Sequence, residues 1–264
     1  MKYLILGGGA MGYYAMLGQL ARLKDKNELH DVEALSGASC GSLAVFMYAI
    51  CRGNIKEMLE KSMEIDIVRC TKPNLLSIID KFGFIRTSAI KHELKKFSKI
   101  KMNIKNPTIG EVAEFCKLDI HIPTFCVTTG KTEYFSNITH KDIKIITIIS
   151  ASIAVPLLFS AQKIKNKLYV DGALEETLPA VPFLGKNWND VMAIEIISEE
   201  QESENKITDI RSFVEIIAKA GLKNRLRFLG INTITLNVSN ELMFDFKMND
   251  FKKLELYVKG FSTD

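Results

Sequence analysis

Residues 32–51, VEALSGASCGSLAVFMYAIC, form the stretch that decides the fold. Residues 32–35 predict a strand that breaks at Ser36-Gly37, and the almost wholly apolar residues 40–51 predict a buried helix. Between them GASCG fits the pattern G-x-S-x-G, in which glycines relieve the crowding of a sharp turn and the serine hydroxyl stands above the sheet. Ser39 is therefore a candidate nucleophile. The alternative is a tight turn whose serine only caps the helix.

The residues before this stretch show the same alternation of strand and helix. Residues 3–6, YLIL, predict a short buried parallel strand that ends in glycines. In residues 13–23 the apolar side chains recur at helical spacing. Strand, helix, strand and helix within the first 51 residues predict an α/β layered fold with a parallel sheet.

The rest of the chain shows no repeat and no linker, so we expect one domain over residues 1–264. An apolar stripe predicts a helix that covers the sheet at residues 210–220, and residues 54–115 are expected to form a mainly helical cap. Residues 199–206, EEQESENK, predict a solvated loop. Further strands are predicted at residues 120–127, 168–170, 191–197 and 233–238.

Residues 145–161, IITIISASIAVPLLFSA, carry no charge and approach the length of a membrane span. Three serines and Pro156 interrupt them, so we predict a buried strand followed by a buried turn and helix. The amino-terminal MKYLILGGGAMG is too short and too rich in glycine for a secretory signal. We therefore expect a cytoplasmic or peripheral membrane location, without a signal peptide or a transmembrane helix.

A glycine-rich loop, GGGAMG at residues 7–12, follows the first predicted strand. Through Gly7, Gly9 and Gly12 it matches the dinucleotide fingerprint G-x-G-x-x-G. That fingerprint also needs an acidic residue at the end of the second strand, where this chain has Ser36-Gly37. The other interpretation is a loop of unhindered N–H groups that forms an oxyanion hole beside Ser39.

A hydrolytic serine needs a base, and no histidine follows His140. In the α/β-hydrolase order the histidine comes last, so a Ser-His-Asp site of that class is not predicted. Asp171 follows the apolar residues 168–170 and precedes a glycine, which puts it at the carboxyl end of a strand, where ligand crevices lie. Burial raises the pKa of such a carboxylate and makes it a better base. The alternative is an Asp-Gly pair that only forms a turn.

Four motifs in this order resemble the patatin-like phospholipase family. LILGGGAMG resembles its glycine-rich oxyanion loop, and GASCGS resembles its G-x-S-x-G turn. ASIAVPLLF at residues 151–159 is similar to its Ala-Ser-x-Ala-x-Pro segment, and YVDGA is similar to its aspartate motif. The resemblance covers residue 3 to about residue 185. Beyond that, the chain is similar to the family only in outline.

The resemblance implies a three-layer α/β/α sandwich with a mainly parallel central sheet. It also implies a phospholipase A-type lipid acyl hydrolase with a Ser-Asp dyad and no metal or other cofactor. Carried over, Ser39 attacks the ester carbonyl, Asp171 accepts its proton, and the N–H groups of Gly8, Gly9 and Cys40 hold the oxyanion. The glycines that support these motifs are Gly7, Gly12, Gly37, Gly41 and Gly172.

The chain departs from the family pattern at Met11, where the glycine loop usually carries Arg or Lys. Loss of that charge would weaken the preference for anionic substrates or lower the rate. Two alternatives to the hydrolase therefore stay open. One is a catalytically weak or silent lipid-binding relative with the same fold, and the other is a dinucleotide-binding protein.

Composition and charge narrow the partners. The net charge of +4 over 264 residues argues against a dedicated nucleic-acid partner, so the expected partner is a phospholipid or another acyl lipid. Residues 86–105 hold seven basic side chains against Glu93, which suggests contact with an anionic membrane; the alternative is a solvated lysine-rich helix. The cysteines are odd in number and include no CxxC pair, so we predict that all of them are free thiols: Cys40, Cys51, Cys70, Cys116 and Cys126.

Overall fold

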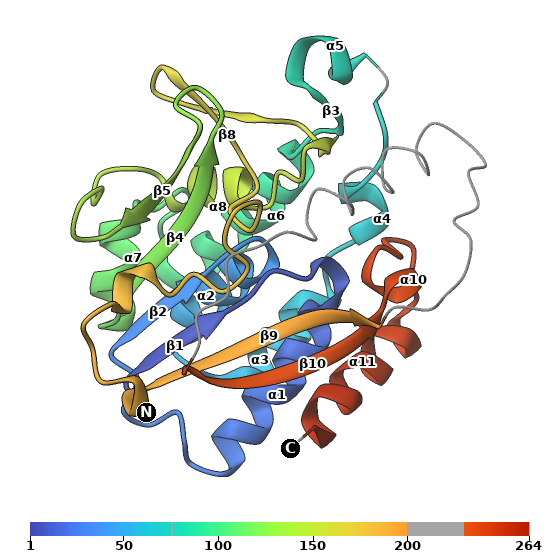
Figure 1. Cartoon of the computed structure of the whole chain (residues 1–264). Helices are drawn as coiled ribbons and strands as arrows, with labels where there is room; N and C mark the ends of the chain where they lie inside the picture. The colour runs from blue at the N-terminus through green and yellow to red at the C-terminus, as the bar shows by residue number, and fades with distance from the viewer. Residues whose placement is uncertain (75, 200–229, 264) are drawn as a thin grey trace.

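The computed structural model describes residues 1–74, 76–199 and 230–263, and within them eight strands form one sheet in the order β10-β9-β1-β2-β4-β8-β7, with β5 paired to β4 (Figure 1). The strands from β10 to β4 run parallel, whereas β5, β8 and β7 pair in antiparallel fashion. The strands of this sheet are β1 (Tyr3–Leu6), β2 (Ala34–Gly37), β4 (Asp119–Cys126), β5 (Lys131–Ser136), β7 (Gln162–Ile164), β8 (Lys167–Val170), β9 (Val191–Glu199) and β10 (Asn232–Ser239). A separate parallel pair joins β3 (Gly83–Ile85) to β6 (Leu157–Phe159).

The central strands agree closely with the sequence prediction, apart from β2, which was predicted over residues 32–35 and lies at Ala34–Gly37. We expected that strand to break at Ser36-Gly37, but both residues belong to it, because Ser36 pairs with Ile5 and Gly37 pairs with Leu6. The neighbouring strand β1 thus extends β2 to the edge of the turn. The turn that carries Ser39 consequently begins directly at the carboxyl end of the sheet.

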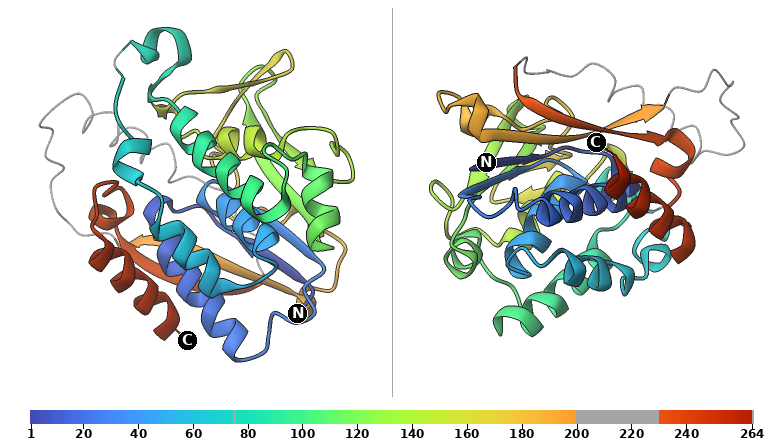
Figure 2. Two further views of the ribbon diagram at one scale, coloured as in Figure 1. Left: turned by 180° about the vertical axis from the view of Figure 1, so that it is seen from behind. Right: turned by 90° about the horizontal axis from the view of Figure 1, so that it is seen from below.

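Helices cover one face of the sheet, and Figure 2 shows them from behind, with α11 beside α1. The main apolar core lies between these helices and the sheet and includes Leu4, Met16 and Phe46. The helices are α1 (Tyr13–Asp25), α2 (Cys40–Ile50), α3 (Ile55–Met63), α4 (Ile67–Cys70), α5 (Ser77–Lys81), α6 (Ser88–Met102), α7 (Ile109–Cys116), α8 (Ile145–Ser152), α10 (Asn240–Met243) and α11 (Asp250–Ser262), with the 3-10 turn η1 (Ala10–Gly12).

The second face of the sheet is covered by the segment that contains the 3-10 helices η2 (Val181–Phe183) and η3 (Trp188–Asp190). In this segment Leu178 and Phe183 pack against Ile5 and Ala193 of the central strands. The fold is the predicted three-layer α/β/α arrangement with a mainly parallel central sheet. The predicted helix at residues 210–220, and residues 200–206 of the predicted loop, lie outside the described residues.

The uncharged stretch 145–161 folds in the opposite order from our prediction. Residues Ile145–Ser152 form the helix α8, and the strand β6 follows it. A short apolar run looks the same in a buried strand and in a buried helix, so its pattern did not distinguish them. Seven of the eight residues of α8 are buried, and within this helix the Ser150 hydroxyl donates to the Ile146 carbonyl, 2.6 Å away.

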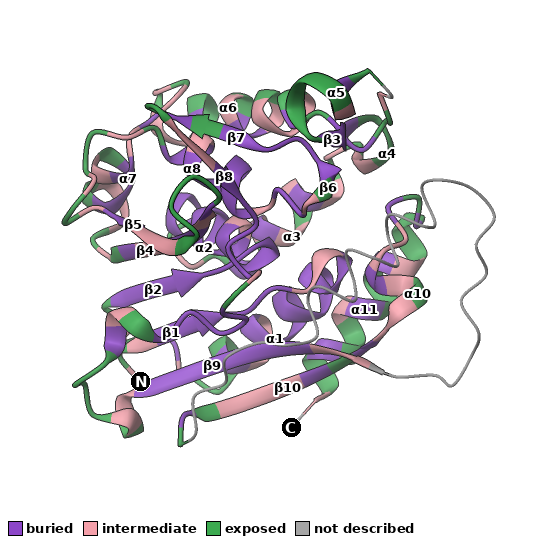
Figure 3. Cartoon of the chain, turned by 45° about the horizontal axis from the view of Figure 1, so that its top comes forward, coloured by how far each residue is buried: buried purple, intermediate pink, exposed green. Residues whose placement is uncertain are grey.

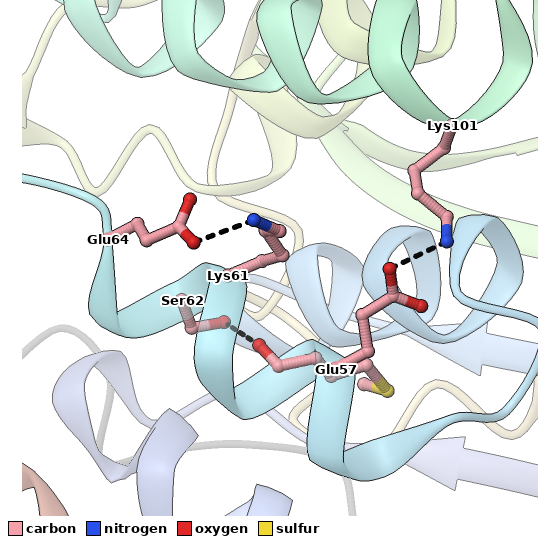
Figure 4. Close-up of polar contacts among 6 residues, drawn as sticks. Glu57, Lys61, Ser62, Glu64 and Lys101 are labelled. Atoms are coloured by element: carbon pink, nitrogen blue, oxygen red, sulfur yellow. Dashed lines mark hydrogen bonds and ion pairs between the residues drawn. The ribbon is translucent and has the colours of Figure 1, made fainter.

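The lysine-rich residues 86–105 are partly engaged within the protein. Lys101 on α6 forms a 2.6 Å ion pair with Glu57 on α3, as Figure 4 shows. Lys91 donates to Gln162 at 2.6 Å, and Lys99 donates to Asn103 at 2.7 Å. The predicted helical character of residues 54–115 is confirmed over α3 to α7, interrupted by β3. No helix among the described residues is both long and apolar enough to cross a bilayer.

Candidate functional site

Ser39 occupies a strained turn between β2 and α2. Its backbone angles, φ 53° and ψ −125°, lie in a region that residues with side chains rarely adopt. The Gly41 amide donates to the Ala38 carbonyl at 2.8 Å and closes the turn. Such a conformation lifts the serine side chain out of the line of the strand, as the G-x-S-x-G pattern predicts.

Gly41 shows why this turn needs glycine. A Cβ atom at this position would lie 2.0 Å from the Leu6 carbonyl oxygen, so α2 reaches the end of β1 only without a side chain there. Gly37 is confined in a similar way, because its Cβ would lie 2.4 Å from the Gly41 carbonyl oxygen. Both flanking glycines of the motif are therefore explained by backbone packing.

Asp171 lies directly beyond β8 and contacts Ser39, 132 positions earlier in the chain. The Ser39 hydroxyl donates to Asp171 Oδ2 at 2.7 Å, and the Ala173 amide donates to Asp171 Oδ1 at 2.7 Å. Ser39 is 7% exposed and Asp171 is 1% exposed, so the contact is shielded from water. A buried carboxylate in this position can remove the serine proton as the oxygen attacks a carbonyl.

Ser152 joins the two halves of this site, a role that the sequence analysis missed. Its Oγ accepts the Ser39 N–H at 3.1 Å and donates to the Pro123 carbonyl at 2.9 Å. Its own carbonyl accepts the Gly172 N–H at 3.0 Å, and the Asp171 N–H donates to the Ala154 carbonyl at 2.9 Å. The segment ASIAVP thus supports the backbone of both predicted catalytic residues. The motif ASIAVP contained Ser152, but nothing in the sequence assigned a function to this serine.

Two of the three predicted oxyanion donors, Gly8 and Cys40, lie beside Ser39 in the structure. A Cβ atom at Gly8 would lie 3.3 Å from the Cβ of Ser39 and 2.8 Å from that of Ala173. The Gly8 N–H donates to the Thr177 carbonyl through a long bond of 3.3 Å. Cys40 is the first residue of α2, where an amide has no acceptor within the helix.

Gly9 follows Gly8 in the glycine loop, and the Cys40 thiol donates to the Gly7 carbonyl of the same loop at 3.7 Å. Burial raises the pKa of the Cys40 thiol, and so does the charge of Asp171, whereas the Gly9 and Gly41 amides oppose the shift. The glycine loop and the start of α2 therefore contact each other beside Ser39. The arrangement can stabilise negative charge on an oxygen beside Ser39.

The remaining motif residues serve as backbone supports. The Gly7 N–H donates to the Ile194 carbonyl at 2.9 Å and ties the loop to β9, and the Gly12 N–H donates to the Gly9 carbonyl at 2.8 Å. A Cβ at Gly172 would lie 2.0 Å from the Pro123 carbonyl oxygen. Met11 is only 5% exposed and belongs to the main apolar core.

A buried glutamate holds the segment that follows Asp171. Glu176 is 4% exposed; its carboxylate accepts the Tyr134 hydroxyl and, at 2.8 Å, the Ala180 N–H. Burial raises the pKa of Glu176, although these donors oppose the shift. Thr177, which accepts the Gly8 amide, comes next in the chain. Glu176 therefore orders the segment against which the glycine loop rests.

Two histidines pack against aromatic rings, and the cysteines form no disulfide with one another. His121 on β4 packs edge-on against Phe183, with ring centroids 5.7 Å apart, and burial lowers its pKa. His140 contacts Phe135, and its Nδ1 lies 2.8 Å from the Thr139 hydroxyl. All five cysteines are free thiols, as predicted. Among the described residues no group of three or more His, Cys, Asp or Glu side chains is arranged to hold a metal ion.

Two viral proteins are similar to this chain in sequence. The "Probable lipid hydrolase 463L" of Invertebrate iridescent virus 6 is 24% identical over 271 residues, covering 98% of this chain and 86% of its own. The "Uncharacterized protein R571" of Acanthamoeba polyphaga mimivirus is 27% identical over 67% of this chain and 59% of its own.

The structure of VipD from Legionella pneumophila has a similar fold. Its TM-score is 0.63 at 13% sequence identity, with 99% of this chain and 65% of VipD covered. This chain therefore spans less than two thirds of VipD and of the mimivirus protein. At this identity the likeness to VipD concerns the fold alone.

A family model covers most of the motifs described above. The model for the patatin-like phospholipases matches residues 4–184. This range begins in β1 and ends just beyond η2, and it contains the glycine loop, the Ser39 turn, Ser152 and Asp171. The chain belongs to the patatin-like phospholipase family.

Proposed function

We propose that this protein hydrolyses acyl ester bonds of lipids through a covalent acyl-enzyme on Ser39. Membership of the patatin-like phospholipase family and the name of the iridescent virus relative support lipid ester hydrolysis. The observation that carries the finer proposal is the 2.7 Å hydrogen bond from the buried Ser39 hydroxyl to Asp171 Oδ2. The family match also argues against the dinucleotide-binding alternative.

In this mechanism Asp171 takes the proton from Ser39 Oγ while the oxygen attacks the ester carbonyl. The tetrahedral intermediate collapses, the alcohol part of the lipid leaves with the proton from Asp171, and the acyl group stays on Ser39. Asp171 then takes a proton from water, whose oxygen attacks the acyl ester. The fatty acid leaves, and the proton returns to Ser39.

The amides of Gly9 and Cys40 are the donors that we assign first to the oxyanion. The Gly8 amide would join them by exchanging its 3.3 Å bond to the Thr177 carbonyl for the stronger bond to an anionic oxygen. Each donor would contribute about 3 kcal/mol to the lowering of the barrier. We further propose that residues 1–264 act as one domain, with acyl lipid as substrate and with no metal or other cofactor in the reaction.

Covalent labelling with a lipid-like fluorophosphonate tests this proposal. Intact mass would be followed over time for the wild type, Ser39→Ala and Asp171→Asn. Asp171→Asn keeps an acceptor for the Ala173 N–H but removes the base, so we expect labelling to slow by about 10²- to 10⁴-fold. Asp142→Asn, at an exposed carboxylate on the surface, is the matched control and should label as the wild type does.

Two results would count against the proposed mechanism. Labelling of Ser39→Ala at the wild-type rate would mean that another nucleophile reacts. A folded wild type that neither labels nor releases fatty acid from phospholipid would favour the silent lipid-binding relative. Fatty-acid release by the wild type but not by Ser39→Ala would support the hydrolase.

A further inference from the structure

Residues 67–86, which we name the α4–β3 segment, expose apolar side chains to solvent. Leu76 is 74% exposed, Ile79 is 79% exposed and Phe82 is 57% exposed. The first two are the most exposed large apolar side chains of the described residues. Figure 3 shows much of α5 as exposed, which the burial of its residues places at 79–81, and Figure 1 shows α5 and β3 standing out from the central strands. We call these three side chains the apolar tip.

The backbone beneath the apolar tip is firmly held. Ser77 is fully buried, and its hydroxyl donates to the Asn74 carbonyl at 2.8 Å and to the Gly83 carbonyl at 2.5 Å. The Asn74 N–H donates to the Phe84 carbonyl at 2.6 Å, and Phe84 itself is buried. The side chains of the tip therefore face outward from a fixed base.

Exposed basic side chains accompany the apolar tip within the α4–β3 segment, and we call them the basic rim. Four exposed basic side chains lie in the α4–β3 segment against one acidic side chain, Asp80, which pairs with Arg86 at 3.7 Å. Exposed apolar side chains with exposed cations in the same segment fit an anionic lipid surface, because the cations approach the headgroups while the apolar groups enter below them. The basic side chains of the rim are Arg69, Lys72, Lys81 and Arg86.

The apolar tip is joined to the candidate site through β6. The Ala154 carbonyl binds the Asp171 amide, and Leu157 follows three residues later, so their Cα atoms are at most about 11 Å apart. Leu157 is 39% exposed and pairs in register with Gly83, the residue after Phe82. A surface at the tip is thus connected to Asp171 by a short, hydrogen-bonded path.

We propose that the apolar tip and its basic rim dock the protein on an anionic lipid bilayer and so bring Ser39 to lipid substrate. This inference rests on the proposed function and deepens it. It also relocates the membrane contact from the lysines of α6, of which Lys101 and Lys91 are bound within the protein, to the α4–β3 segment. We assign an anionic bilayer as the binding partner because exposed basic side chains and exposed apolar side chains lie in the same segment.

A second exposed apolar stripe lies on α11, at Phe251, Leu254 and Val258. Its neighbours on that helix are of mixed charge, with Asp250 and Glu255 among the lysines, so nothing there selects an anionic surface. This stripe therefore serves as the matched control. The control replaces the same number of apolar side chains as the tip variant, three of the four that α11 exposes, the fourth being Phe261.

Sedimentation with vesicles tests the docking in the Ser39→Ala background, where no hydrolysis alters the lipid. The tip variant would be Leu76→Gln, Ile79→Gln and Phe82→Asn; asparagine suits the left-handed backbone of Phe82, whose φ is 58°. The control variant would be Phe251→Gln, Leu254→Gln and Val258→Gln. With phosphatidylcholine–phosphatidylserine vesicles we expect the tip variant to bind at least about 100-fold more weakly, because each lost apolar group contributes roughly tenfold. The control should bind as its parent does.

The charge of the rim is tested separately with Lys72→Gln, Lys81→Gln and Arg86→Gln. This variant should lose binding to vesicles that contain phosphatidylserine and become insensitive to added salt. Binding of the tip variant equal to that of its parent would overturn the proposal. So would failure of the parent to sediment with anionic vesicles, or an equal loss in the α11 control.

The same variants separate docking from catalysis. In the background with Ser39 intact, hydrolysis of a water-soluble short-chain ester should be unchanged by the tip substitutions, while fatty-acid release from vesicles falls with binding. A protein that binds vesicles through the tip but hydrolyses neither substrate would refute the proposed function and leave the docking inference standing. An active protein whose tip variant keeps full vesicle binding would refute the docking alone.

Discussion

Replacement of Ser152 by alanine tests the arrangement of the site most directly. Ser152 is fully buried, and its hydroxyl accepts the Ser39 N–H at 3.1 Å and donates to the Pro123 carbonyl at 2.9 Å. Ser152→Ala removes both bonds and brings no other polar group in their place. A buried group that loses its partner costs about 1–3 kcal/mol.

The expected loss in the free energy of unfolding, for two groups that each lose a partner, is therefore about 2–6 kcal/mol. The unfolding entropy per residue, scaled to a chain of this length, predicts a fall in melting temperature of about 2 °C per kcal/mol, so roughly 4–12 °C in total. The Ser39 amide also helps to hold the strained turn, with its φ of 53°. A small displacement of the nucleophile is expected to slow fluorophosphonate labelling by about 10- to 100-fold.

Ser150→Ala is the matched control for this experiment. Ser150 lies on the same helix, is equally buried, and donates only to the Ile146 carbonyl one turn earlier. Its loss should cost about 1 kcal/mol and leave the labelling rate unchanged. Thermal unfolding and labelling rates of both variants would be compared with the wild type. Equal losses in the two variants would refute the role that we assign to Ser152.

Three further changes have defined outcomes. Gly41→Ala would put a Cβ atom 2.0 Å from the Leu6 carbonyl oxygen, so we expect little folded protein by circular dichroism; a wild-type melting curve would contradict the packing at the turn. Met11→Arg would bury a charge in the apolar core and lower the melting temperature by several degrees, whereas Met11→Leu should change it little. Burial lowers the pKa of His121 in the folded protein. As the pH falls below about 6.5, the imidazole is therefore protonated in the unfolded chain before it is protonated in the folded one, and the free energy of unfolding decreases. His121→Gln should therefore flatten the dependence of melting temperature on pH in that range, and an unchanged slope would show that other groups cause it.

Much of the fold was predictable because local patterns carry it. The strands β1, β4, β8, β9 and β10 lie where short apolar runs predicted them, and α1 follows its helical stripe. The error at residues 145–161 has a physical cause. α8 is buried on every side, so it lacks the polar face whose spacing reveals a helix in a sequence.

The sequence by itself determined the candidate residues of the site, because each depends on a local backbone requirement. A tight strand-to-helix turn needs the glycines around Ser39, and a strand end that meets the Pro123 carbonyl needs Gly172 beside Asp171. Such requirements leave recognisable letters at fixed spacing. The motif order then suggested that Ser39 and Asp171 belong to one site.

Only the tertiary structure decided how these residues are oriented and supported. In the folded chain the Gly8 amide donates to the Thr177 carbonyl, and the Ser39 amide donates to the Ser152 hydroxyl. The apolar tip is exposed on a segment whose backbone accepts a hydrogen bond from Ser77. Each of these contacts joins elements that are distant in the chain or depends on which face of a helix is left uncovered. Hydrogen bonds of this kind follow from the packing of layers, and a linear pattern of residue types does not contain that packing.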